Sequence, residues 1–94
     1  MTVLQIEHKV PNYNGWKKAF DSDPINRKES GVRRHRIFRP TDDPEYVIIQ
    51  LEFETLHAAG EALTALRKLW TKVEGKVMTD PQTRMLDVAE AIEY

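Results

Sequence analysis

The chain has 94 residues, of which 40% are hydrophobic and 31% charged, and 14 Lys and Arg against 15 Asp and Glu give a formal net charge of −1. This composition is typical of one folded domain, 1–94, and excludes a disordered chain. It also excludes a general nucleic-acid-binding protein, because such proteins carry an excess of basic residues. The absence of cysteine excludes disulfides and thiolate chemistry, and with no apolar run near the roughly 18 residues of a membrane span and no signal peptide, we expect a cytoplasmic protein without membrane contact.

The first predicted element is a strand over 3–10, which Pro11 ends because proline cannot donate to a strand ladder. An amphipathic helix follows and extends to about residue 22. Its Tyr13, Trp16 and Phe20 are spaced three and four residues apart and therefore share one face. The alternation of the strand predicts one largely apolar face made of Leu4, Ile6, His8 and Val10.

Cap and breaker residues set the limits of this first helix. Asn12 or Asn14 can cap its N-terminus. Asp23-Pro24 ends it, since the residue before proline avoids helical geometry. Residues 25–30 are predicted to add a helical turn, which Gly31 closes.

Two strands, over 32–39 and 46–54, are predicted to form a hairpin around the Pro/Asp-rich turn 40–44. The second has a clear apolar face consisting of Val47, Ile49, Leu51 and Phe53. The phase of 32–39 stays open, because both of its faces are mostly polar. One face carries Val32, Arg34, Arg36 and Phe38, and the other carries Arg33, His35 and Ile37.

A second amphipathic helix is predicted from the N-cap Thr55 to Gly75, with an apolar stripe made of Leu56, Ala59, Leu63, Leu66, Trp70 and Val73. A loop over 76–82 follows. The last strand is predicted over 83–92, although its alanines and glutamates also allow a helix. Its alternation separates Leu86, Val88 and Ile92 from Met85, Asp87, Ala89 and Ala91.

The order β-α-β-β-α-β predicts an α+β, ferredoxin-like domain with an antiparallel sheet and both helices on one face. The other face is predicted to carry Tyr46, Ile48, Met85 and Phe38, which are unfavourable together in open water. We therefore expect a homodimer through this sheet face. Arg34 and Arg36 are expected to pair with the carboxylates of Glu7, Glu52 and Asp87.

Several motifs carry a resemblance to a known family. They are Val10 with Tyr13, Trp16, Lys17 and Phe20; Gly31-Val32-Arg33-Arg34; Asp42-Asp43-Pro44 with Tyr46-Val47; Leu66-Arg67 with Leu69-Trp70; and Pro81-Gln82 with Arg84. Through these the chain resembles the dimeric α+β barrel superfamily, which includes antibiotic-biosynthesis monooxygenases, haem-degrading monooxygenases and small polyketide cyclases. It is most similar to short bacterial members. The resemblance implies two subunits packed sheet to sheet, with a cavity in each between helices and sheet.

The catalytic motifs of the family carry over poorly. Haem-degrading relatives use an asparagine on the first strand, a tryptophan on the second helix and a histidine about three turns later. This chain has Gln5 and Glu7 on the strand, Trp70 on the helix and Met78-Thr79-Asp80 where the histidine is expected. Haem binding through His57, His8 or His35 is therefore only a third alternative. No cofactor is expected.

The candidate catalytic residues are His8, His35, Arg34, Arg36 and Tyr46, and the candidate ligand-binding residues are Trp16, Trp70, Phe20 and Tyr46. No metal site is expected, because His8 and His35 would lie about 10 Å apart across an intervening strand. Two functions stay open. One is binding of a small planar organic molecule, with turnover as a cofactor-independent monooxygenase or polyketide-cyclase-like enzyme. The other is a non-catalytic structural or ligand-binding module whose sheet interface is filled by salt bridges.

Overall fold

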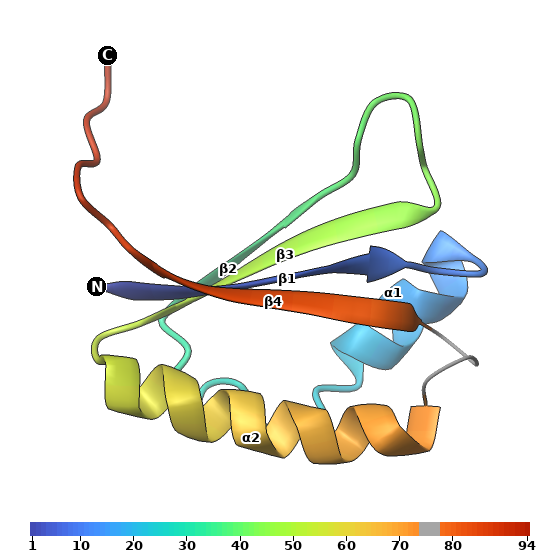
Figure 1. Ribbon diagram of the computed structural model, residues 1–94, viewed down its shortest axis with the longest axis horizontal. Helices are drawn as coiled ribbons and strands as arrows, with labels where there is room; N and C mark the ends of the chain where they lie inside the picture. Colours follow the sequence, from blue (N-terminus) through green and yellow to red (C-terminus); the bar gives the residue numbers. More distant parts are fainter. Residues whose placement is uncertain (74–77) are drawn as a thin grey trace.

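The computed structural model describes residues 1–73 and 78–94, and its chain follows the predicted β-α-β-β-α-β order. The elements are β1 (Thr2–Lys9), α1 (Tyr13–Asp21), β2 (Arg34–Phe38), β3 (Tyr46–Phe53), α2 (Leu56–Val73) and β4 (Thr79–Asp87). The strands form an antiparallel sheet in the order β2-β3-β1-β4, and α1 and α2 cover the same face (Figure 1). The predicted ferredoxin-like α+β fold is confirmed.

The hydrophobic core lies between the sheet and the helices. Phe53, Leu4, Leu51 and Val47 are its largest fully buried side chains, and they come from the two central strands. Burial of each large apolar side chain contributes about 1.5–3 kcal/mol, so these strands anchor the domain. The helices add the rest of the core, notably Trp16, Ala59, Ala62 and Trp70.

Both predicted helix starts have a side-chain cap. Asn12, rather than Asn14, caps α1, and its Oδ1 accepts a hydrogen bond of 2.8 Å from the Gly15 N–H. Thr55 Oγ1 accepts a bond of 3.1 Å from the Ala58 N–H at the start of α2. The predicted stop of the second helix at Gly75 falls outside the described residues.

The segment after α1 consists of turns, and the helical turn predicted over 25–30 is reduced to a single i→i+4 turn that does not continue as a helix. Asn26 has φ 54° and Asp23 has φ 56°, and these left-handed conformations interrupt a right-handed helix. Hydrogen bonds close the turns instead, including Ser30 N–H to the Asn26 carbonyl at 2.9 Å. We call residues 22–31 the strap, because they connect α1 to β2 on the helix side of the sheet (Figure 1). It ends at Gly31, where φ is 96°.

The register of β2 settles the phase that the sequence left open. Arg34 lies opposite Glu52 and Arg36 opposite Gln50, which puts both arginines on the sheet face away from the helices. His35 and Ile37 lie opposite Leu51 and Ile49 and therefore belong to the helix side. We call the face away from the helices the open face.

The prediction for the last strand is wrong in both extent and phase. β4 covers Thr79–Asp87 rather than 83–92, and the exposed residues 88–94 leave the sheet (Figure 1). Met85 lies opposite Leu4, so Met85 and Asp87 belong to the helix side. On the open face β4 instead contributes Gln82, Arg84 and Leu86.

A β-bulge in β4 lies opposite His8. Glu7 is paired with Gln82 and Lys9 with Thr79, so two residues of β4, Asp80 and Pro81, face one of β1. Asp80 adopts φ 52°, which accommodates the extra residue. The sequence signal of Asp80-Pro81 therefore marks a bulge in an edge strand, where proline is tolerated, rather than a loop before the strand.

Candidate functional site

A cavity of about 200 Å³ lies between the sheet, the two helices and the start of the strap. The side chains that matter to its chemistry are His8, Trp16, Phe20, Arg27, Trp70 and Met78. Both tryptophans of the chain are therefore cavity walls, and both are also core residues, 6% and 9% exposed. Most of the remaining lining is aliphatic, so the few polar groups must decide what binds there.

Aromatic rings form one wall of this cavity. The His8 and Trp16 ring centroids are 5.9 Å apart, and those of Trp16 and Phe20 are 5.2 Å apart. Beyond Phe20, the His35 ring makes an edge contact at 5.1 Å. Because His8 is on β1 and His35 on β2, with β3 between them, the row crosses the sheet over about 10 Å. Trp16 and Phe20 are four residues apart on α1 and therefore share the helix face that forms this wall.

His8 is the buried polar group at one end of the row, 2% exposed. Its Nδ1 lies 3.0 Å from the Lys9 carbonyl oxygen, which can only accept, so Nδ1–H donates this hydrogen bond. Burial lowers the pKa of His8, and the bond to Lys9 offsets this in part. The imidazole is therefore neutral at pH 7, with Nε2 as a hydrogen-bond acceptor.

The Nε2 atom of His8 is accessible, and His8 lines the cavity. Nε2 has no hydrogen-bond partner among residues 1–73 and 78–94. Within these residues no sealed side-chain nitrogen or oxygen lacks a partner, so Nε2 is not sealed. His8 also lines the cavity, which makes Nε2 available to a bound molecule.

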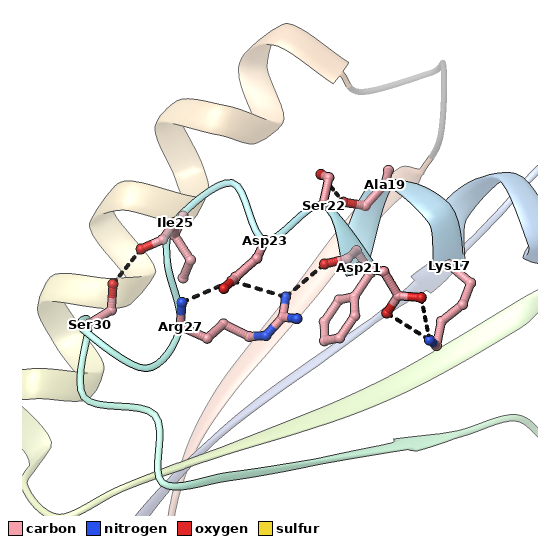
Figure 2. Close-up of polar contacts among 9 residues, drawn as sticks. Lys17, Ala19, Asp21, Ser22, Asp23, Ile25, Arg27 and Ser30 are labelled. Carbon is pink, nitrogen blue, oxygen red and sulfur yellow. Dashed lines mark hydrogen bonds and ion pairs between the residues drawn. The ribbon is translucent and has the colours of Figure 1, made fainter.

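Arg27 of the strap is the second polar group of the cavity. Figure 2 shows its polar contacts. Its Nη1 donates a hydrogen bond of 2.8 Å to the Phe20 carbonyl and lies 3.5 Å from Asp23 Oδ1. The guanidinium carbon is 3.9 Å from the centroid of the Phe20 ring, a cation–π contact. The Asp23 side chain also accepts the Arg27 backbone N–H at 2.8 Å, which fixes this turn.

The structure brings only some of the predicted site residues together. His8, Trp16, Phe20 and Trp70 line the cavity, while His35 lies beside Phe20 without lining it. Partial burial first, and the cations Arg27 and Lys17 next, lower the pKa of His35. The other three candidates, Tyr46, Arg34 and Arg36, lie on the open face, across the sheet from the cavity.

On the open face, polar side chains form a hydrogen-bonded ladder. The Tyr46 hydroxyl donates to Glu7 Oε1 at 2.8 Å, and Gln5 Nε2 donates to Glu7 Oε2 at 3.2 Å. Gln50 Nε2 in turn donates to Gln5 Oε1 at 3.0 Å. Burial, and then this bond to Glu7, raise the pKa of Tyr46, so its hydroxyl stays protonated at neutral pH.

The predicted salt bridges of the open face are absent from the described part of the chain. There, neither Arg34 nor Arg36 pairs with a carboxylate, and Arg36 stacks on the Phe38 ring at 4.9 Å. Glu7, one of the carboxylates predicted to pair with these arginines, accepts hydrogen bonds from Tyr46 and Gln5 instead. In residues 1–73 and 78–94, no cluster of three His, Cys, Asp or Glu residues could hold a metal, and no helix is long and apolar enough to cross a membrane.

Sequence reasoning missed Arg27 and Met78 as residues of the cavity. Arg27 stood in the segment predicted as a helical turn, and Met78 in the predicted loop. Met78 is 3% exposed although it lies just outside β4. The Asp23-Pro24 signal marked the end of α1 but carried no sign that the following turns bring Arg27 back under Phe20.

Neither a family model nor a curated protein matches this chain. Several solved structures match it over nearly the whole chain. SnoaB, a cofactor-independent oxygenase from Streptomyces nogalater, has a TM-score of 0.79 at 12% identity, with 99% of this chain and 97% of that chain covered. MhuD, in a crystal structure with two manganese protoporphyrin IX molecules per active site, has a TM-score of 0.76 at 16% identity, with both chains fully covered. A dimeric ferredoxin-like protein from an uncultured marine organism has a TM-score of 0.67 at 11% identity, with 97% of each chain covered.

At these identities the likeness concerns the fold. An antibiotic biosynthesis monooxygenase also shares it. The predicted resemblance to this group of dimeric ferredoxin-like proteins is confirmed at that level.

Proposed function

We propose that the protein binds a small planar aromatic molecule of one or two rings in the cavity beneath α1. The observation that carries this proposal is one neutral imidazole nitrogen, His8 Nε2, that is accessible in a cavity whose walls are mostly aromatic and aliphatic. Aromatic walls favour a planar ligand through offset stacking, and the lone acceptor favours a ligand with a hydroxyl group.

The size of the cavity supports the same ligand class. An apolar cavity of about 150 Å³ holds benzene, and pockets for drug-sized ligands begin at about 300 Å³. At about 200 Å³, this cavity fits one ring with substituents or two fused rings. A tetrapyrrole such as the porphyrin bound by MhuD is larger than this cavity in its present form.

As an enzyme, the protein would act as a cofactor-independent oxygenase or cyclase. His8 Nε2 takes the proton of a ring hydroxyl, and the resulting phenolate is electron-rich at its ring carbons. In the oxygenase case the phenolate reacts with molecular oxygen. One oxygen atom enters the product, and the other leaves as water with two hydrogens from the ligand. The indoles of Trp16 and Trp70 would hold the ring during this step.

The test compares two neutral probes, 4-hydroxybenzamide and 4-methoxybenzamide, of which only the first has a ring hydroxyl that can donate to His8. The two tryptophans that line the cavity report binding through their fluorescence. One hydrogen bond is worth about 0.5–1.5 kcal/mol, so we expect the hydroxy probe to bind about 2–13 times more tightly. His8→Leu should abolish this preference. His57→Gln should keep it, because His57 is exposed on α2.

Two results would contradict the proposal. Equal affinity of the two probes for the unmodified protein would show that Nε2 does not accept a ligand hydroxyl. A fluorescence change that never saturates with either probe would remove the cavity as a binding site.

The proposal includes a homodimer formed through the open face. The half-buried ladder of Tyr46, Glu7, Gln5 and Gln50 and the 36% exposed Phe38 ring would gain burial under a second sheet. The fold is shared with dimeric ferredoxin-like proteins, which supports this arrangement. Since the cavity lies on the helix side, each subunit would keep its own ligand site.

A further inference from the structure

We infer that the ligand carries a carboxylate at the end away from its hydroxyl, and that Arg27 recognises this carboxylate. The inference rests on the proposed function and names the ligand class more closely: a planar aromatic hydroxy acid. It follows from the position, the remaining donors and the local charge of Arg27.

Arg27 and His8 lie at opposite ends of the aromatic wall. The row runs from His8 through Trp16 to Phe20, and Arg27 stacks on the Phe20 ring at 3.9 Å. The two polar groups are thus separated by the Trp16 and Phe20 rings. An aromatic ring with a hydroxyl and an acidic group in para positions presents its oxygens at opposite ends, which matches this arrangement.

The guanidinium of Arg27 is held in place and still has donors to offer. Nη1 is engaged by the Phe20 carbonyl and Asp23, and the side chain is only 16% exposed. The Nε and Nη2 groups have no partner among residues 1–73 and 78–94. They are not sealed off, because no sealed side-chain nitrogen in that part of the chain lacks a partner. A fork of this kind, fixed on one side, matches the two oxygens of a carboxylate.

The charges around Arg27 favour a single negative charge on the ligand. Lys17 and Asp21 neutralise each other in a contact of 2.7 Å (Figure 2). Asp23 Oδ1 approaches Nη1 only to 3.5 Å and is also engaged by the Arg27 backbone N–H. One carboxylate would therefore complete the pairing of Arg27, whereas a doubly charged phosphate would leave one charge without a partner in an apolar cavity.

The experiment adds 4-hydroxybenzoate to the neutral probe 4-hydroxybenzamide, which has nearly the same shape. Hydrogen bonds to a charged group exceed neutral ones, and we expect the unmodified protein to prefer the benzoate at least about tenfold. Arg27→Gln should remove this preference while leaving the amide affinity within about threefold. Arg33→Gln is the matched control for net charge, since Arg33 is 60% exposed and pairs with Glu54 at the surface.

The variant Arg27→Lys distinguishes lost carboxylate recognition from a loss of folding in Arg27→Gln. Lysine keeps the charge but not the fork, so it should retain a reduced preference for the benzoate even if Arg27→Gln folds poorly. Equal affinity of the unmodified protein for the two probes would overturn this inference and leave the proposed function standing. The same conclusion would follow if Arg33→Gln reduced the preference for the benzoate as much as Arg27→Gln does. Failure of both probes to bind would overturn the proposed function and this inference with it.

Discussion

Protonation of His8 should make the stability of the protein depend on pH in a defined window. The unfolded chain takes up this proton near the ordinary pKa of 6.5, while burial lowers the pKa of His8 in the folded protein. Above pH 6.5 both states are neutral, so His8 contributes no pH dependence there. Below pH 6.5 the unfolded chain is protonated while folded His8 is still neutral. The free energy of unfolding therefore decreases as the pH is lowered, until the pH reaches the pKa of folded His8.

The size of this effect follows from one proton. The free energy of unfolding should fall by at most about 1.4 kcal/mol for each pH unit below 6.5. A domain of 94 residues has a total stability of about 5–14 kcal/mol, so the loss is readily measurable. His8→Gln should remove this component, because glutamine does not titrate.

Urea unfolding followed by tryptophan fluorescence at pH 7.5, 6.5 and 5.5 measures the effect. Carboxylates and His35 titrate in both proteins, so the difference between the unmodified protein and His8→Gln isolates His8. His57→Gln serves as the control on an exposed histidine. If the two proteins lost stability in parallel as the pH fell, the argument for a buried neutral His8 would be refuted. Affinity for 4-hydroxybenzamide should fall only at lower pH, as the pH approaches the lowered pKa of folded His8, since protonation of the folded protein removes the Nε2 acceptor.

Three further predictions concern the fold and the assembly. Asn12→Ala removes the α1 cap and should cost about 1 kcal/mol of stability in urea melts, whereas an equal loss in Asn14→Ala would argue against the cap. Gly31→Ala should lower the free energy of unfolding by about 1–2 kcal/mol, because φ is 96° at this position. Crowding is not the cause, since the added carbon would meet its nearest neighbour at 3.6 Å, and an unchanged urea midpoint would contradict this prediction. Ile48→Lys places a charge on the open face and should turn a dimer into a monomer by light scattering, and an unmodified protein that is monomeric at micromolar concentration would contradict the proposed dimer.

The alternation of the central strands was sufficient to predict the core of the domain. In β3 the apolar positions repeat every second residue without interruption, so the face that meets the helices followed directly. β2 carries polar residues on both faces, and its phase depends on pairing with β3 rather than on its own pattern. The phase of β4 was predicted wrongly because the predicted alternation included Val88 and Ile92, which lie beyond the end of the strand.

The cavity was predictable only where the side chains are on regular elements. Trp16 and Phe20 follow from helical spacing, and His8 from strand alternation. Arg27 reaches the cavity through left-handed turns at Asp23 and Asn26, which no periodicity predicts. Tyr46 was grouped with the tryptophans by residue type, but the sheet separates it from them.

The two edges of the sheet are both poor templates for another strand. β2 is short and bears Arg34 and Arg36, and β4 carries a proline and a bulge. Charges, brevity, proline and bulges at edges all hinder the lateral strand pairing that leads to aggregation. Lateral growth of the sheet is thereby opposed at both edges, which leaves the open face as the surface for the proposed dimer.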